Sequence, residues 1–227
     1  MRKSILILGA ILLCSTFSFA QRDDKDLTPQ DPKAQEILDK LSAKAEAYKS
    51  FHADFEYTLV NTGEGINETQ KGQVTMKGKK NYKIDVAGQE VSSDGQTVWT
   101  FIKDAGELQI SDIPEENDED GNLMNPANAF HMYKKGFKYK YDGTATVDGQ
   151  GVDVIKMFPI NPQGKNFHTI IININSEKLE LVSMEVRGKD GNVYTYRLKN
   201  FKADVPVTDA DFIFDESRAD DVIDLRE

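Results

Sequence analysis

Cysteine is almost absent from this 227-residue chain, and histidine is scarce. The single cysteine, Cys14, lies in an apolar N-terminal stretch that we interpret below as a cleaved signal. The mature chain then has no thiol for catalysis, disulfides or metal binding. The three histidines, His52, His131 and His168, are far apart and match no zinc-binding spacing such as HExxH. Both absences argue against a thiol enzyme and against a zinc hydrolase.

Recognisable catalytic motifs are also missing. The chain has no GxSxG nucleophile elbow, no Walker phosphate loop and no pair of carboxylates set apart for acid–base chemistry. An acidic run, Glu116–Gly121, resembles the start of a calcium loop, but its twelfth position is Ala127 where a bidentate Glu is required. We therefore expect a protein that is not an enzyme and that needs neither a metal nor a cofactor.

The N-terminus has the three-part pattern of a secretory signal. Two cations precede an apolar run at residues 4–19, and Ser18 and Ala20 are the small residues expected before a cleavage site. The run is shorter than the about 20 residues that a transmembrane helix needs. We therefore predict a cleaved signal peptide over residues 1–20 and a periplasmic mature protein.

Negative charge dominates the rest of the chain. The net charge is −10, and removal of the signal with its Arg2 and Lys3 makes it −12. Such a surface repels nucleic acid and disfavours anionic membrane surfaces. No linker rich in Pro, Gly or Ser divides the middle of the chain. We expect a disordered linker at residues 21–30 and one domain over residues 31–227.

One long amphipathic helix is expected first. Asp31 is a suitable N-cap, Pro32 suits the first helical position, and apolar residues follow at helical spacing up to Tyr48. The period changes to two from Phe51, which predicts strands, and the Asp-Gly pairs between later alternating runs are typical of hairpin turns. About ten or eleven strands are expected up to Leu198.

Two segments interrupt this pattern. The acidic, apolar-poor run at residues 114–122 is expected to be a solvated loop. After it, Asn125-Pro126 predicts a second, short helix with Phe130 on its apolar side. We expect the acidic tail from Asp215 to be loosely held.

The predicted fold class is mainly β with some α. Short turns between the strands favour an antiparallel sheet, and so many strands in one sheet must curl. A curled sheet has a concave apolar face, which the two helices can cover. Periodicity leaves open whether the covered space is filled by side chains or is a ligand cavity.

From about residue 34 to residue 214 the chain resembles the LolA family, the periplasmic carriers of outer-membrane lipoproteins. The resemblance rests on Ser50–Phe55 after the opening helix, on Gly72–Met76, on Ser93–Trp99 with its Asp-Gly turn, and on Phe212–Phe214, which resembles the family's closing strand. It implies a curved antiparallel half-barrel covered by helices around an apolar cavity.

The resemblance also implies which side chains line that cavity, although most of them would be core residues in any β protein. The candidates are Phe55, Tyr57, Val74, Met76, Tyr82, Ile84, Trp99, Phe101 and Phe130. A shift of one residue in a strand would invert its assignment, because neighbouring side chains point to opposite faces. Family members often tie the sheet to the lid with an Arg, whereas this chain has Lys79 and Lys80 as candidate lid contacts, which cannot reproduce the planar grip of Arg.

The function implied by the resemblance is that of a soluble periplasmic carrier, which shields the acyl chains of lipoproteins during transfer from the inner to the outer membrane. Its implied partners are acylated lipoproteins, an inner-membrane lipoprotein-releasing ABC transporter and an outer-membrane acceptor. Two alternatives stay open: a LolA-like binder of another lipid or glycolipid or an envelope sensor, and an enzyme or a purely structural β domain.

Overall fold

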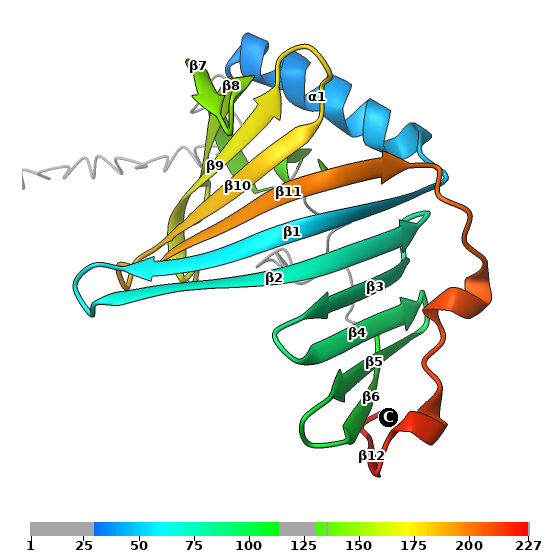
Figure 1. Cartoon of the computed structure of the whole chain (residues 1–227). Helices are drawn as coiled ribbons and strands as arrows, with labels where there is room; N and C mark the ends of the chain where they lie inside the picture. Colours follow the sequence, from blue (N-terminus) through cyan, green and yellow to red (C-terminus); the bar gives the residue numbers. More distant parts are fainter. Residues whose placement is uncertain (1–29, 114–129, 135, 227) are drawn as a thin grey trace, which may run out of the picture.

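The protein is built around one open twelve-stranded sheet with a long helix on one face (Figure 1). A computed structural model describes residues 30–113, 130–134 and 136–226. The expected solvated loop and second helix fall largely on residues 114–129, outside the described residues. A short 3₁₀ helix, η3 (Met132–Lys134), lies just after them. No helix among the described segments has the length and apolarity needed to cross a membrane.

The predicted first helix is α1 (Pro32–Ala47), and it begins where the sequence indicates. The side chain of Asp31 accepts hydrogen bonds from the backbone N–H groups of Lys33 and Ala34, and Pro32 occupies the first turn. Leu38 and Leu41 are buried at the spacing of one helical face. This face packs on the sheet.

The strands follow the chain in hairpins, so that ten of the eleven neighbour pairs are antiparallel and one, β12 with β6, is parallel. The order across the sheet is β12-β6-β5-β4-β3-β2-β1-β11-β10-β9-β8-β7. The strands are β1 (Ser50–Asn61), β2 (Ile66–Lys77), β3 (Asn81–Val86), β4 (Gln89–Asp94), β5 (Thr97–Ile102), β6 (Glu107–Asp112), β7 (Phe137–Val147), β8 (Gln150–Pro159), β9 (Phe167–Asn175), β10 (Leu181–Gly188), β11 (Val193–Ala203) and β12 (Asp221–Asp224).

The register defines two faces of the sheet, because directly paired residues point the same way. Ala53, Val74, Ile84 and Val91 are paired in sequence across β1 to β4 and belong to the hydrophobic core that includes α1. We call this the inner face and the opposite side the outer face. The main core lies between the inner face, α1 and the residues around η3.

The C-terminal residues form a strap, residues 204–226, that runs from the end of β11 to the far edge of the sheet (Figure 1). It contains two 3₁₀ turns, η4 (Asp209–Phe212) and η5 (Glu216–Arg218), and ends in β12. Two expectations were therefore wrong. Phe212–Phe214 is not a closing strand, and the tail from Asp215 is not loosely held, because β12 pairs with β6 and completes the sheet.

Candidate functional site

The inner face is a broad apolar surface. A second inner row, Phe51, Met76 and Tyr82, lies beside the row that defines the face, and these three residues are buried. Phe130 packs edge-on against Phe51 with ring centroids 6.0 Å apart. The sheet therefore offers more apolar surface than one sixteen-residue helix can cover.

Polar contacts hold α1 over this face. At its start, Asp31 accepts a hydrogen bond from the backbone N–H of Tyr141 in β7. In its middle, the hydroxyl of Tyr133 donates to Asp39 at 2.7 Å, and the Ser42 hydroxyl lies 2.8 Å from Nδ1 of His131. Most of these contacts tie α1 to residues 131–133 and not to the strands themselves.

A further polar contact lies near the end of α1. Lys44 forms an ion pair of 3.1 Å with Glu180, just before β10. Both side chains are about one-third exposed, so the pair is screened by solvent and contributes little to stability. The end of α1 is therefore held mainly by packing.

A rim of half-buried apolar side chains borders the covered core. Its members come from strands on both sides of the helix and are Phe55, Ile84, Val91, Tyr141, Tyr194, Tyr196, Leu198 and Phe201. Half-buried apolar surface is costly to leave in water, so these side chains favour contact with a further apolar group. The rim is thus the part of the inner face open to an apolar ligand.

Three tyrosines cluster at one side of the rim, where Tyr57 of β1 contacts the rim residues Tyr194 and Tyr196. The ring of Tyr57 lies 5.1 Å from that of Tyr196 and 6.3 Å from that of Tyr194. Burial, with a smaller effect of the neighbouring tyrosines, raises the pKa of Tyr196 to about 12, and burial also raises the pKa of Tyr57. Tyr57 and Tyr196 therefore stay neutral at ordinary pH and can face apolar groups.

Little free space exists beneath the second half of α1. A pocket there holds about 10 Å³ and is lined by residues that include Leu41, Ala45, Phe130 and Leu198. Pockets for small molecules have about 300–1,000 Å³. An acyl chain can enter this part of the inner face only if α1 or the residues around η3 move. A wider groove of about 630 Å³ has mainly charged and polar walls, including Asp54, Lys71, Asp85 and Lys199, and suits acyl chains poorly.

The structure brings seven of the nine candidate lining residues to one face. Val74, Met76, Tyr82 and Phe130 are buried, whereas Phe55, Tyr57 and Ile84 are half-buried towards the rim. The first four belong to the main core, and the other three keep part of their surface exposed.

Trp99 and Phe101 are the exceptions, because they lie on the outer face. Thr100 pairs with Val91 of the inner face, so its two neighbours point the other way. There they form a separate core with Leu108, Ile110 and Phe214 under the strap. We call these five residues the outer core. The period of two identified them as neighbours on one face of β5, but only the register between strands decides which face that is.

The candidate lid contacts, Lys79 and Lys80, are exposed in the turn between β2 and β3. Neither forms an ion pair with a residue that the structure describes. Burial and the charge of Lys134 lower the pKa of His131, and the charge of Lys79 adds a smaller effect in the same direction. The contacts that hold α1 come instead from Asp31, which the sequence marked as a cap, and from Tyr133 and His131, which carried no signal of this role.

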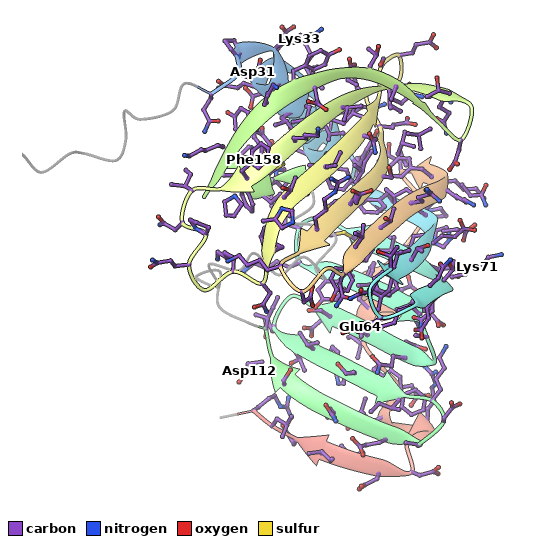
Figure 2. The ribbon with its side chains drawn as sticks, turned by 90° about the vertical axis from the view of Figure 1, so that its left-hand side faces the viewer. Asp31, Lys33, Glu64, Lys71, Asp112 and Phe158 are labelled. Atoms are coloured by element: carbon purple, nitrogen blue, oxygen red, sulfur yellow. The ribbon has the colours of Figure 1, made fainter. Side chains whose placement is uncertain are left out.

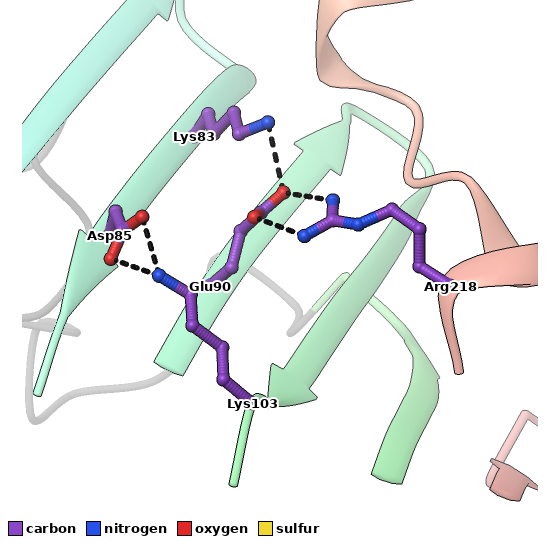
Figure 3. A network of polar contacts seen from close by, with 5 residues as sticks. All are labelled: Lys83, Asp85, Glu90, Lys103 and Arg218. Carbon is purple, nitrogen blue, oxygen red and sulfur yellow. Dashed lines mark hydrogen bonds and ion pairs between the residues drawn. The ribbon is translucent and has the colours of Figure 1, made fainter. Parts of the chain in front are cut away.

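A charged network fixes the strap to the outer face (Figure 3). Arg218 forms two hydrogen bonds of 3.0 Å with the carboxylate of Glu90, and Lys83 lies 2.9 Å from the same carboxylate. The guanidinium also lies over the rings of Phe101 and Phe214, at 5.3 and 4.5 Å. Arg218 therefore combines a bidentate ion pair with stacking, which a lysine could not do.

Comparisons with known proteins were consistent with the resemblance. The family model described as outer membrane lipoprotein carrier protein LolA matches residues 46–215. No curated protein matches the chain. An uncharacterized conserved protein from Thermus thermophilus shares the fold, with 14% identity, a TM-score of 0.54, and coverage of 85% of this chain and 99% of that one.

Two further solved structures are similar at lower TM-scores. A LolA superfamily protein from Nitrosomonas europaea has 14% identity and a TM-score of 0.43, and it covers 80% of this chain and 97% of its own. LprF from Mycobacterium bovis has 20% identity and a TM-score of 0.46, with the same coverage of 80% and 97%.

Proposed function

This chain belongs to the LolA family of outer membrane lipoprotein carrier proteins, and from that premise we propose that it shields the acyl chains of lipoproteins in the periplasm. The cleaved signal at residues 1–20 and the linker at residues 21–30 are part of the same proposal. So are its partners, an inner-membrane lipoprotein-releasing ABC transporter that loads it and an outer-membrane acceptor that unloads it.

The observation that best supports this proposal is the half-buried apolar rim beside a helix that covers only part of the inner face. Each buried methylene is worth about 0.8 kcal/mol, so an acyl chain gains several kcal/mol by leaving water for such a surface. The described residues include no group of three or more metal-ligating side chains that could hold an ion. The apolar side chains of the inner face and its rim favour binding of an apolar ligand.

Entry of a chain requires α1 to move, because the space under it is nearly filled. When α1 moves away from the residues around η3, the hydrogen bond that the Tyr133 hydroxyl donates to Asp39 and the contact between Ser42 and His131 are broken. A closed state that must open lowers the apparent affinity by the fraction of open protein. A moderate affinity of this kind suits a carrier that must also release its cargo.

The proposal is tested with a synthetic peptide that carries diacylated cysteine at its N-terminus, and with the same peptide without acyl chains. We expect saturable binding of the acylated peptide alone, measured by calorimetry on delipidated protein. The Ile84→Glu variant, which places a charge on the inner face, should weaken this binding at least ten-fold. Equal affinity for the two peptides would refute the proposal.

A matched control separates the inner face from a general effect of charge. Gln73 lies on the outer face of β2, one residue from the inner-face Val74. The Gln73→Glu variant adds the same charge and should leave binding unchanged. Mass spectrometry of lipid bound to freshly purified protein then distinguishes a lipoprotein from the alternative cargo, another lipid or a glycolipid.

A further inference from the structure

Two large apolar side chains are exposed near the end of β8. Phe158 is 36% exposed and Ile160 is 42% exposed. Phe158 pairs with Lys138 of β7, and the residues beside them, Met157 and Tyr139, are buried in the main core. Phe158 and Lys138 therefore point from the outer face, away from the cargo surface on the inner face.

Lysines surround these apolar side chains. Lys140 and Lys156 are directly opposite each other on β7 and β8, where like charges repel. One carboxylate serves both, since Asp142 lies 2.7 Å from Lys156 and 4.0 Å from Lys140. Lys138 forms no ion pair with any residue in the described segments. We call Lys138, Lys140, Lys156, Phe158 and Ile160 the basic apolar patch.

The charge of the patch is opposite to that of the molecule. It has three lysines against one nearby carboxylate, while the whole chain has a net charge of −10. The acidic residues that make the chain negative therefore lie mainly outside the patch. The negative net charge of the chain disfavours binding to an anionic membrane, but the local charge of the patch is positive. Figure 2 shows Phe158 on one side of the molecule and Lys71 of the β1–β2 hairpin on the other.

We propose that the basic apolar patch docks the protein on bilayers that contain anionic phospholipid. Phe158 and Ile160 enter the interfacial layer, and the lysines contact the headgroup phosphates while their methylene stems lie along apolar groups. An acidic protein surface would match the lysines but not the two protruding apolar side chains. The patch leaves α1 and the rim free, so docking and cargo binding are separate events.

The test is sedimentation of the mature protein with vesicles. Phosphatidylcholine vesicles are compared with vesicles of phosphatidylcholine and phosphatidylglycerol, at low and at raised salt. We expect binding that requires the anionic lipid and weakens with salt. Each lysine near such a surface contributes about five-fold in affinity. The Lys138→Gln/Lys140→Gln variant should thus bind about 25-fold more weakly, and Phe158→Ser should weaken binding further.

The control variant removes two lysines elsewhere. Lys71→Gln/Lys202→Gln makes the same charge change at exposed outer-face positions, and it should bind as the unchanged protein does. Equal losses in the two double variants, or binding that ignores the anionic lipid, would overturn the proposal. So would the absence of vesicle binding.

A further pair of measurements separates docking from cargo binding. The patch variants should bind the acylated peptide in solution normally, whereas Ile84→Glu should still sediment with anionic vesicles. Loss of sedimentation in Ile84→Glu would mean that the cargo surface, and not the patch, holds the vesicle. The two measurements can therefore refute membrane docking without refuting the carrier function, or refute the carrier function without refuting docking.

Discussion

Glu90 is a buried carboxylate that is stabilised in its ionised form by Arg218 of the strap. Burial alone would raise its pKa, but the hydrogen bonds from Arg218 and Lys83 outweigh that effect and lower the pKa to about 2. The unfolded chain has the ordinary pKa of 4.5. The ionised carboxylate therefore stabilises the fold fully above pH 4.5, and this contribution is lost as the pH falls from 4.5 towards 2.

Removal of Arg218 tests this contribution. Arg218→Ala leaves Glu90 buried with Lys83 as its main cationic partner, so we expect a loss of about 1–3 kcal/mol in the free energy of unfolding at pH 7. The loss should shrink between pH 4.5 and 2, because Glu90 becomes protonated there in both proteins. Urea unfolding at several pH values measures it, and a loss that is the same at pH 3 and pH 7 would contradict this account.

Trp99 is the only tryptophan, and its position makes it a reporter of the strap. It is 6% exposed in the outer core, and its indole N–H has no hydrogen-bond partner among the described residues. We expect saturation with acylated peptide to leave the emission maximum of Trp99 unchanged, because the rim that we propose binds the acyl chains lies on the inner face. A saturable shift would place Trp99 against the cargo, as the sequence suggested.

For single residues, the sequence pattern predicts which side chains share one face of a strand, but not on which face of the sheet they lie. Val74 and Met76 were correctly placed together, and so were Trp99 and Phe101, because alternation is a property of one strand. Which face each pair occupies depends on the register with neighbouring strands, and the outer face here also has an apolar cover. The tail that covers the outer face is polar and acidic, so its composition gave no sign that it covers a second core.

Among the elements, β2 depends on one residue without a side chain. A Cβ on Gly72 would lie 2.5 Å from both the carbonyl oxygen of Asp85 and the ring of Phe55. Gly72→Ala should therefore disturb the β2–β3 pairing and displace Phe55 from the rim, at a cost of about 1–3 kcal/mol in stability. Thermal unfolding and binding of acylated peptide both measure this effect.

Gly151 in β8 is the matched control. A Cβ there meets no atom within 4 Å and its φ is not positive, so Gly151→Ala should be neutral or stabilise by about 0.4–1 kcal/mol. A similar loss of stability in both variants would show that the close approach at Gly72 is not the cause.

The attachment of α1 gives a second prediction at this scale. Tyr133→Phe removes only the hydroxyl that donates to Asp39. We expect a loss of about 1 kcal/mol in stability and faster uptake of acylated peptide in stopped-flow experiments, because opening costs less. Slower or unchanged uptake would mean that α1 does not move with cargo entry.

The sequence predicted elements where local chemistry decides them. Asp31 and Pro32 set the start of α1, and the change of period at Phe51 set the first strand. The strap was mispredicted because its order comes from distant partners, namely the ion pair of Arg218 with Glu90 and the pairing of β12 with β6. The polar composition of the strap predicts that it is exposed to solvent, but it does not show which distant residues the strap contacts.

At the scale of the molecule, the strap connects β11 near the centre of the sheet to β6 near its edge, spanning the strands from β1 to β5. It leaves β11 beside Ser50, whose hydroxyl donates to the carbonyl of Val205, and it ends on β6. Deletion of residues 205–227 should expose the outer core, shift the emission of Trp99 to longer wavelength and lower the thermal midpoint. Unchanged emission would show that the strap does not cover Trp99 in solution.

The pairing of β1 with β11 has a consequence for how the chain acquires its structure. Ser50 and Val205 are 155 positions apart, yet the strands that contain or adjoin them form the centre of the sheet. Closing so long a loop carries an entropic cost before any contact rewards it, so we expect the β1–β11 pair to form after the local hairpins. The centre of the sheet cannot form until nearly the last residues emerge. During synthesis the chain can therefore form its hairpins one after another, but the two series of hairpins are joined into one sheet only once β11 has been made.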